Sequence, residues 1–331
     1  NMKLKEDFQE NKELIMKQTV IVIAGPTASG KSGIGIELAK RLDGVVISAD
    51  SMQIYKGLDV GTAKVSVTEA QGIVHELIDI LDVNQNFSVS EYKEACYEKI
   101  EEILKAGKLP IIVGGTGLYI NAVVNNMIFE KIDQVQEREI EKKLQELIEG
   151  KSSNELYELL KNIDEKAALN IECGNDKRII RAIKLSLLGT KKSDIDKRND
   201  LWHKNDSKYN FFVTYIDMPR DLLYDRINKR VDMMVEQGII QEATMLYNIK
   251  EKNVTAKHAI GYKEFFAYID GTKSLEECTE LLKQKSRNYA KRQITWFKKL
   301  QDKFTVDGTK TKDEIVGDIL KEYNEKNKCG K

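Results

Sequence analysis

The chain has few of the features that mark secreted, membrane or zinc-binding proteins. Its four cysteines lie far apart and form no C-x-x-C pair, so neither a disulfide framework nor a zinc site is predicted, and a reducing cytoplasm is expected. No apolar run approaches the roughly 20 residues that a membrane-spanning helix needs. Residues 1–18 are charged and polar, unlike a signal peptide. The three histidines lack metal-ligand spacing, and no motif implies a protein partner, which is compatible with a monomer.

The formal net charge of the chain is 0, which alone argues against a nucleic-acid partner. The charge is distributed unevenly, however. Residues 1–128 have a net charge of −4 and residues 129–175 of −5, whereas residues 176–303 have +9. A basic third of a neutral chain can form a surface that binds phosphates, or its basic side chains can be solvated without any partner. Charge alone leaves both alternatives open.

Apolar runs and amphipathic stretches alternate in the first part of the chain. Residues 19–24, 45–49 and 110–113 are apolar and largely β-branched, and they predict buried strands. Residues 91–106 have apolar side chains at helical spacing and end before Gly107, so they predict a helix. This order of strands and helices predicts an α/β fold, a P-loop NTPase-like parallel sheet flanked by helices.

The strand signals vanish over residues 129–208, where charged amphipathic stretches such as 137–149 and 154–160 predict an inserted helical subdomain for RNA contact. The predicted α/β core comprises residues 17–128 and 209–310, and residues 311–331 are expected to form a charged tail with a weak helix at 313–323. Within the second part of the core the expected elements are a strand at 211–217, helices over 220–250 and 274–299, and an edge strand at 304–306.

Residues 25–32 read GPTASGKS and fit the phosphate-loop pattern G-x-x-x-x-G-K-[ST], between a predicted strand and a predicted helix over 32–42. The glycines let backbone N–H groups converge on phosphate oxygens at the positive end of the helix. Lys31 would neutralise phosphate charge, and the Ser32 hydroxyl would ligate Mg²⁺, the expected cofactor. The expected diphosphate-binding residues are Gly25, Thr27, Ala28, Ser29, Gly30, Lys31 and Ser32.

A phosphate loop alone does not separate kinases, GTPases and ATPases. Gly33 and Gly35, in the first turns of the predicted helix, each weaken it by about 1 kcal/mol and have no explanation in the sequence.

A second motif, DSMQIYKGLDVGTAK, occupies residues 50–64. Together with the phosphate loop it resembles the tRNA dimethylallyltransferase family. Further matches follow in the family's order over roughly residues 19–300, although Val74 stands where the family usually has proline. They are HELID at 75–79, VGGTGLY at 113–119, NDKR at 175–178 with RAI at 181–183, AIGY at 259–262 and AKRQITWF at 290–297.

The resemblance implies transfer of the dimethylallyl group from dimethylallyl diphosphate to N6 of the adenosine that is 3′-adjacent to the anticodon of tRNA. Asp50, at the carboxyl end of a predicted strand, would orient the weakly nucleophilic amine and accept its proton. From its position alone, Asp50 could equally bind Mg²⁺ or cap a helix. The resemblance places Thr116 and Arg220 at the leaving pyrophosphate. Alternatively, the Thr116 hydroxyl forms a hydrogen bond only within the 114–117 turn, and Arg220 forms a surface ion pair with Asp221 or Asp225.

A further set of polar and basic residues is expected to contact the anticodon stem-loop: Ser51, Gln53, Arg178, Arg181, Arg287, Lys291, Arg292 and Gln293. The Gln53 amide could read an adenine edge or cap the following turn. On the helix predicted around residues 285–299, basic residues alternate with Trp296 and Phe297, which could stack on bases or belong to the core.

Three other functions are compatible with parts of the sequence. A small-molecule P-loop kinase needs neither the 50–64 motif nor the 290–297 motif. A prenyltransferase acting on free adenine nucleotide would use the same core but leave the basic region at 176–303 without a role. A nucleotide-dependent RNA-binding module without chemistry would tolerate replacement of Asp50.

Overall fold

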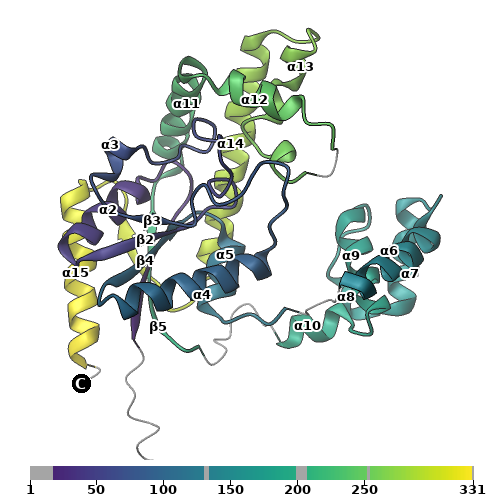
Figure 1. Cartoon of the computed structure of the whole chain (residues 1–331), viewed down its shortest axis with the longest axis horizontal. Helices are drawn as coiled ribbons and strands as arrows, with labels where there is room; N and C mark the ends of the chain where they lie inside the picture. Colours follow the sequence, from purple (N-terminus) through teal and green to yellow (C-terminus); the bar gives the residue numbers. More distant parts are fainter. Residues whose placement is uncertain (1–17, 130–133, 199–206, 252–253, 330–331) are drawn as a thin grey trace, which may run out of the picture. The chain divides into compact units, whose positions relative to one another are not determined.

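The computed structural model describes residues 18–129, 134–198, 207–251 and 254–329 (Figure 1). The chain falls into two units that divide after residues 124 and 206. Every strand of the described residues lies in the larger unit, and the elements described within the smaller unit (125–206) are all helices. The sequence predicts this insertion at 129–208. None of the helices formed by the described residues is both long and apolar enough to span a membrane.

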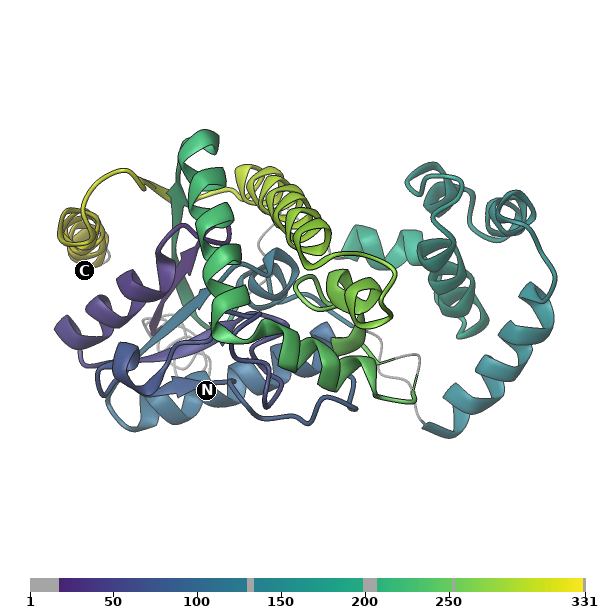
Figure 2. The same cartoon turned by 90° about the horizontal axis from the view of Figure 1, so that it is seen from above.

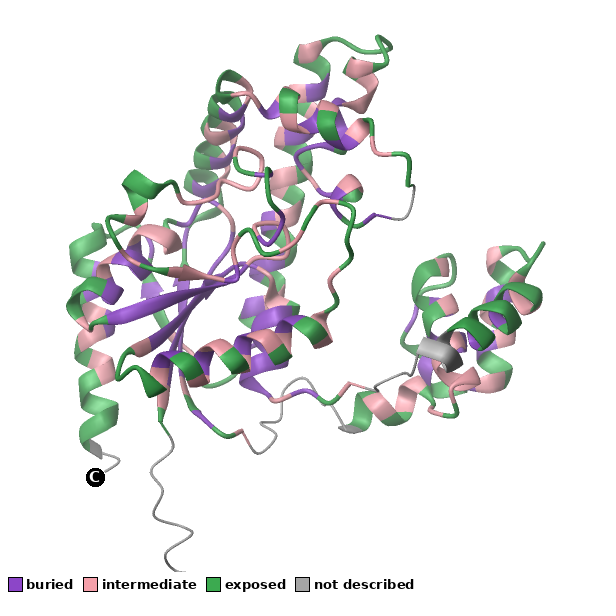
Figure 3. Ribbon diagram, viewed as in Figure 1, coloured by how far each residue is buried: buried purple, intermediate pink, exposed green. Residues whose placement is uncertain are grey.

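The larger unit is built on a parallel six-stranded sheet, which confirms the predicted fold class. The strand order is β3-β2-β4-β1-β5-β6. The strands are β1 Thr19–Ala24, β2 Gly44–Ala49, β3 His75–Glu76, β4 Leu109–Gly114, β5 Asn210–Asp217 and β6 Phe304–Asp307. The central strands are almost wholly buried because helices cover both faces (Figure 3).

Two helices, α2 (Lys31–Arg41) and α15 (Lys312–Cys329), cover one face of this sheet and lie side by side in Figures 1 and 2. Residues 311–331 are therefore not a separate tail. Ile315, Val316 and Ile319 of α15 are buried against the sheet and α2, because their spacing gives this charged helix one apolar face. The other face is covered by α4 (Val89–Lys105) and α5 (Gly117–Val124).

A second apolar core joins the 50–64 segment to the C-terminal helices of the larger unit. Ile54, Tyr55 and Leu58 pack there against those helices. The predicted single helix over 220–250 is wrong, because Gly238 adopts a left-handed conformation (φ 104°) and ends it. The elements are α11 Arg220–Gln237, α12 Ile239–Tyr247, η1 Ala256–His258, η2 Lys263–Phe265, α13 Phe266–Ile269 and α14 Leu275–Lys298. A Ser274–Glu277 capping box starts α14, and α3 (Val67–Ala70) is a single turn.

The smaller unit has a core of its own, formed by apolar residues such as Leu156, Leu160, Ile179 and Ile183. Arg178 and Arg181 are exposed on its fourth helix, α9. Its helices are α6 Gln134–Ile148, α7 Ser153–Ile163, α8 Glu165–Leu169, α9 Asp176–Leu187 and α10 Lys192–Arg198.

Candidate active site

Three central strands end level with one another and direct the following residues to one edge of the sheet. Ala24 of β1 and Ala49 of β2 both pair with Gly114 of β4. A Cβ at Gly114 would lie 2.2 Å from the Ala49 carbonyl oxygen, so only glycine allows this approach. The phosphate loop and Asp50 therefore emerge together, at the edge where open parallel sheets bind ligands.

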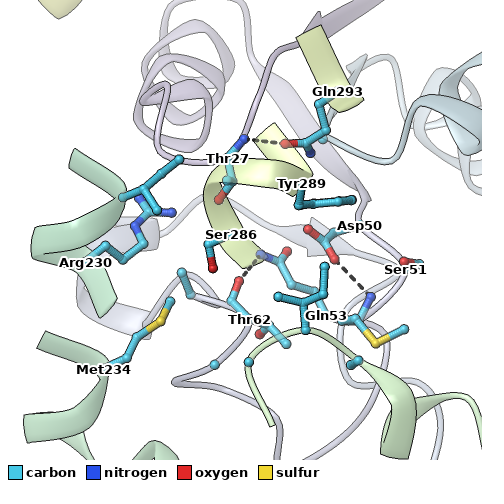
Figure 4. A pocket seen from close by; sticks show the side chains of 18 of the residues that line it. Thr27, Asp50, Ser51, Gln53, Thr62, Arg230, Met234, Ser286, Tyr289 and Gln293 are labelled. Atoms are coloured by element: carbon cyan, nitrogen blue, oxygen red, sulfur yellow. Dashed lines mark hydrogen bonds between the residues drawn. The ribbon is translucent and has the colours of Figure 1, made fainter. Parts of the chain in front are cut away.

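A pocket of about 260 Å³ opens at this edge within the larger unit (Figure 4). Its polar lining includes Thr27, Lys31, Ser32, Asp50, Ser51, Gln53, Thr62, Arg230, Ser286, Tyr289 and Gln293. Its apolar lining includes Met52, Val113, Ile227, Val231, Met234, Ala259, Ile260 and Leu282. The pocket thus combines cations, a carboxylate and an apolar wall.

The phosphate loop has the backbone of an anion cradle. Gly30 (φ 84°) and Ala28 (φ 63°) are left-handed, and α2 follows with no side-chain cap hydrogen bond on Gly30. The Ala28 side chain packs away from the pocket into an apolar cluster. Ser29 is buried, and its hydroxyl has no hydrogen-bond partner among the described residues. Ala28 can therefore meet a diphosphate only through its backbone, whereas the Ser29 N–H already donates to the Pro26 carbonyl oxygen at 3.3 Å.

Lys31 and Arg230 place two cations at the pocket. Lys31 donates a hydrogen bond to the Pro26 carbonyl oxygen at 3.2 Å. Burial lowers the pKa of Lys31 to about 8; Asp50 raises this pKa and Arg230 lowers it, so the three groups are close neighbours. Burial also lowers the pKa of Arg230. An anion bound between the two cations would stabilise both charges.

Arg220, expected from the sequence to reach the leaving group, does not line this pocket. It is the exposed first residue of α11 and borders a separate hollow with Lys298 and Asp307. Arg230, ten residues later on the same helix, takes the pocket position. The sequence held a signal for it, because Ile227 and Val231 mark the buried face of α11 and Arg230 adjoins that face.

Asp50 is fixed by the turn that follows β2. One of its oxygens, Oδ1, accepts the Met52 N–H at 2.9 Å. The neighbouring Ser51 N–H donates to the Thr116 hydroxyl at 3.1 Å. Thr116 is not among the residues that line the pocket, and its hydroxyl holds the Ser51 backbone beside Asp50. Asp50 presents its carboxylate to the pocket across from Arg230 (Figure 4).

Gln53 uses both ends of its amide within the fold. Its Oε1 accepts the Ser48 hydroxyl at 3.0 Å, and its Nε2 donates to the Thr62 carbonyl oxygen at 3.3 Å. Gln53 therefore ties the 59–64 loop to β2 while lining the pocket. This arrangement favours the alternative in which Gln53 holds a turn.

Gln293 is buried and turned inward, contrary to the expectation that it contacts RNA. It is 6% exposed, accepts the Thr27 N–H at 2.9 Å and donates to the Gly115 carbonyl oxygen at 2.9 Å. Gln293 thus ties α14 to the phosphate loop and to the turn after β4. Tyr289, one helical turn earlier, lines the pocket, and burial raises its pKa to about 12, so it remains a neutral hydroxyl.

Some basic residues of α14 are exposed to solvent, and another is held by a hydrogen bond within the protein. Lys291 and Arg292 are exposed, and Arg292 lies 5.5 Å from the centroid of the Tyr289 ring. Arg287 donates to Asn228 Oδ1 at 2.6 Å on α11. The aromatic residues belong to the core, since Phe297 is fully buried and Trp296 packs so closely that a Cβ at Gly117 would lie 2.3 Å from its ring.

The pocket has few ligands for a metal ion. Ser32 and Asp50 offer a hydroxyl and a carboxylate, and the described part of the chain contains no group of three or more acidic, histidine or cysteine side chains that could hold a metal. Mg²⁺ commonly takes one or two protein oxygens together with substrate phosphates and water. These residues fit such a site only when a diphosphate supplies the remaining ligands.

Comparison with known proteins gives a consistent picture. Residues 53–300 match the family model described as IPP transferase. The tRNA dimethylallyltransferase of Acetivibrio thermocellus is 45% identical over 300 residues, covering 90% of this chain and 93% of that protein. The one from Oceanobacillus iheyensis is 43% identical over 306 residues, covering 92% and 95%.

Solved structures agree with these relatives. The tRNA delta(2)-isopentenylpyrophosphate transferase of Staphylococcus epidermidis has a TM-score of 0.68 and 40% identity, covering 94% of this chain and 100% of that one. A eukaryotic dimethylallyltransferase acting on tRNA has a TM-score of 0.73 and 29% identity, covering 88% and 74%.

Proposed function

This chain belongs to the IPP transferase family, and on that premise we propose that it transfers the dimethylallyl group of dimethylallyl diphosphate to N6 of an adenosine in tRNA. Prenyl transfer to tRNA is the activity named for its relatives. We assign the acceptor to the adenosine 3′-adjacent to the anticodon, as the resemblance to the tRNA dimethylallyltransferase family implies.

The observation that supports this reaction is that charged and apolar side chains line the same pocket. Lys31, of the phosphate loop, is a close neighbour of both Arg230 and Asp50, and Figure 4 shows Asp50 across the pocket from Arg230. Ile227 and Val231 add apolar side chains to the same lining. A ligand with a polyanionic diphosphate head and a short apolar tail matches this distribution.

In the proposed step, the allylic carbon–oxygen bond to the diphosphate breaks and a carbon–nitrogen bond to N6 forms. The N6 proton passes to the Asp50 carboxylate, which the Met52 N–H holds in place. The electron pair of the broken bond leaves with the pyrophosphate. Lys31, Arg230 and the N-terminus of α2 stabilise this growing negative charge.

Mg²⁺ is the cofactor we propose, with Ser32 as its protein ligand at the diphosphate. When bound, it would neutralise part of the phosphate charge. We assign Asp50 to the base and not to the metal. Its Oδ1 accepts the Met52 N–H, which fixes the carboxylate at the place proposed for the adenosine.

We propose that the anticodon stem-loop meets exposed basic side chains of both units. Lys291 and Arg292 are exposed on α14, and Arg178 and Arg181 are exposed on α9. Such residues contact phosphates and position a nucleic acid without reading its sequence. The target base must leave its stack to reach Asp50. The kinase, free-nucleotide and non-catalytic alternatives are not supported by the relatives, which are named as tRNA-modifying transferases.

Single-turnover transfer of labelled dimethylallyl to unmodified tRNA, with Mg²⁺, tests the proposal. Asp50→Asn preserves size but cannot accept the proton, so the rate should fall about 10²–10⁴-fold while both substrates still bind. Asp225→Asn, at an exposed position on α11, is the matched control and should retain the wild-type rate. Wild-type turnover in Asp50→Asn would remove Asp50 from the mechanism, and no labelled RNA from the wild type would refute the function.

A further inference from the structure

The carboxylate of Glu242, on α12, collects four hydrogen bonds beside the pocket. Its Oε1 accepts the N–H groups of Asp59 at 2.9 Å and Val60 at 2.7 Å. Its Oε2 accepts the Gly61 N–H at 3.0 Å and the Tyr262 hydroxyl at 3.0 Å. Three successive backbone donors thus converge on one side chain that is far away in the sequence.

The loop that Glu242 binds forms part of the pocket. Gly61, Thr62 and Ala63 line it directly. The Thr62 carbonyl oxygen accepts the Gln53 amide, and Gln53 in turn accepts the Ser48 hydroxyl at the end of β2. A continuous series of hydrogen bonds therefore runs from Glu242 through the loop to the strand end that precedes Asp50.

The Gly61 N–H donates to Glu242, while its neighbours are also tied within the loop: the Thr62 hydroxyl donates to the Leu58 carbonyl oxygen at 2.6 Å, and the Ala63 N–H to the Val60 carbonyl oxygen at 3.0 Å. A Cβ at Gly61 would lie 2.6 Å from the Tyr262 ring, so the backbone packs directly on the aromatic ring and offers no side chain of its own. Tyr262 is fully buried, and burial raises its pKa, which keeps the hydroxyl protonated as a donor to Glu242. The carboxylate thus orients the Gly61 N–H within a loop that has further hydrogen bonds of its own.

The packing of α12 does not depend on the same side chain. Ile239, Ala243 and Leu246 are fully buried and hold this helix in the second core, while Glu242 is half-buried and faces the loop. A change in the charge of Glu242 should therefore leave the helix in place and disturb the loop.

We propose that Glu242 is a positioning residue for prenyl transfer, which fixes the acceptor side of the pocket by holding the 59–62 loop against Gln53. This role rests on the proposed function. The diphosphate side is built from different elements, the phosphate loop and Arg230 of α11. Glu242 should consequently affect the use of tRNA and not the binding of dimethylallyl diphosphate.

The test is Glu242→Gln. Its remaining carbonyl oxygen can still accept from Asp59 and Val60, but its amide N–H₂ would face the Gly61 N–H, two donors without an acceptor. We expect kcat/KM for tRNA to fall about 10- to 100-fold, as for a donor left unsatisfied. The Kd for dimethylallyl diphosphate should stay close to that of the wild type, and the thermal melting midpoint should fall by only a few degrees. Glu242→Asp, which keeps the charge, should recover part of the loss.

Glu236→Gln, at an exposed position on α11, is the matched control and should behave as the wild type. Two outcomes overturn the proposal: an unchanged kcat/KM for tRNA in Glu242→Gln, or a parallel loss of diphosphate affinity and melting midpoint, which a purely structural role predicts. A wild-type protein inactive on tRNA would instead refute the proposed function itself, and this role with it.

Discussion

The lowered pKa of Lys31 predicts how the affinity for dimethylallyl diphosphate depends on pH. Burial places this pKa at about 8. Because the pKa is lowered, the amine is charged below pH 8 and loses its charge as the pH rises through that value. Bound diphosphate favours the charged form, so it should raise the pKa in the complex. Loss of the Lys31 proton in the free protein should therefore weaken diphosphate binding.

The size of the effect follows from that value. With a pKa of about 8, charged Lys31 outnumbers the neutral form about ten to one at pH 7, and the ratio is reversed at pH 9. If only the charged form binds well, the apparent Kd should rise about tenfold between these two pH values. The ligand itself should not contribute, since the last phosphate ionisation occurs near pH 6.

Isothermal titration or fluorescence competition between pH 6.5 and about 9.5 measures this dependence directly. Lys31→Arg keeps the cation charged throughout, because a guanidinium has a pKa above about 12, and should bind with a flat profile. A wild-type affinity that is constant across this range, or a sloping profile in Lys31→Arg, would refute the reasoning.

Two further predictions concern cations on the helices of the larger unit. Arg230→Gln should weaken dimethylallyl diphosphate binding or slow pyrophosphate departure at least tenfold (about 1.4 kcal/mol). Arg220→Gln should leave both unchanged. A loss in Arg220→Gln without a loss in Arg230→Gln would return Arg220 to the site. Charge reversal at Lys291 or Arg292 should flatten the dependence of tRNA affinity on salt by about one unit of log–log slope per contact, with no change in diphosphate affinity. Arg287 should show a smaller effect, because Asn228 already engages it; a slope that no variant changes would contradict the assignment of α14.

The four central strands, β1, β2, β4 and β5, could be predicted because each is a largely apolar run buried on both faces. β3 was missed for the opposite reason: His75 and Glu76 are polar, and the strand is defined only by backbone pairing with β2. Gly238 offered a break signal within the predicted 220–250 helix, but a glycine is also tolerated inside helices, and its left-handed conformation is a property of the folded chain.

The site could be predicted where a residue follows a strand directly, as Asp50 does, or belongs to a loop motif between a strand and a helix, as Lys31 does. It could not be predicted where rotation of a helix decides which side chains face inward. Gln293 adjoins two exposed basic residues in sequence, yet it is the one that points into the protein. Tyr289 was missed because a local motif contains no information about the helix face that meets the sheet edge, whereas Arg230 was missed although it adjoins the apolar face marked by Ile227 and Val231.

The structure explains one of the two glycines in the first turns of α2, Gly35, by its packing against β4. A Cβ there would lie 2.6 Å from the Val113 side chain, so this glycine lets α2 approach β4 closely. Gly33 has no comparable neighbour, since the nearest atom belongs to Lys312 at 3.8 Å, and nothing in the structure explains it.

The pairing of β1 with β5 has a consequence for how the protein is made. β1 lies between β4 and β5, and the whole helical unit separates β4 from β5 in the chain. On the ribosome, β1 therefore emerges early and keeps one edge unpaired until the helical unit has been translated. Exposed strand edges invite aggregation during such a wait. A slow-translating or truncated chain should accordingly need chaperone protection of β1 until β5 arrives.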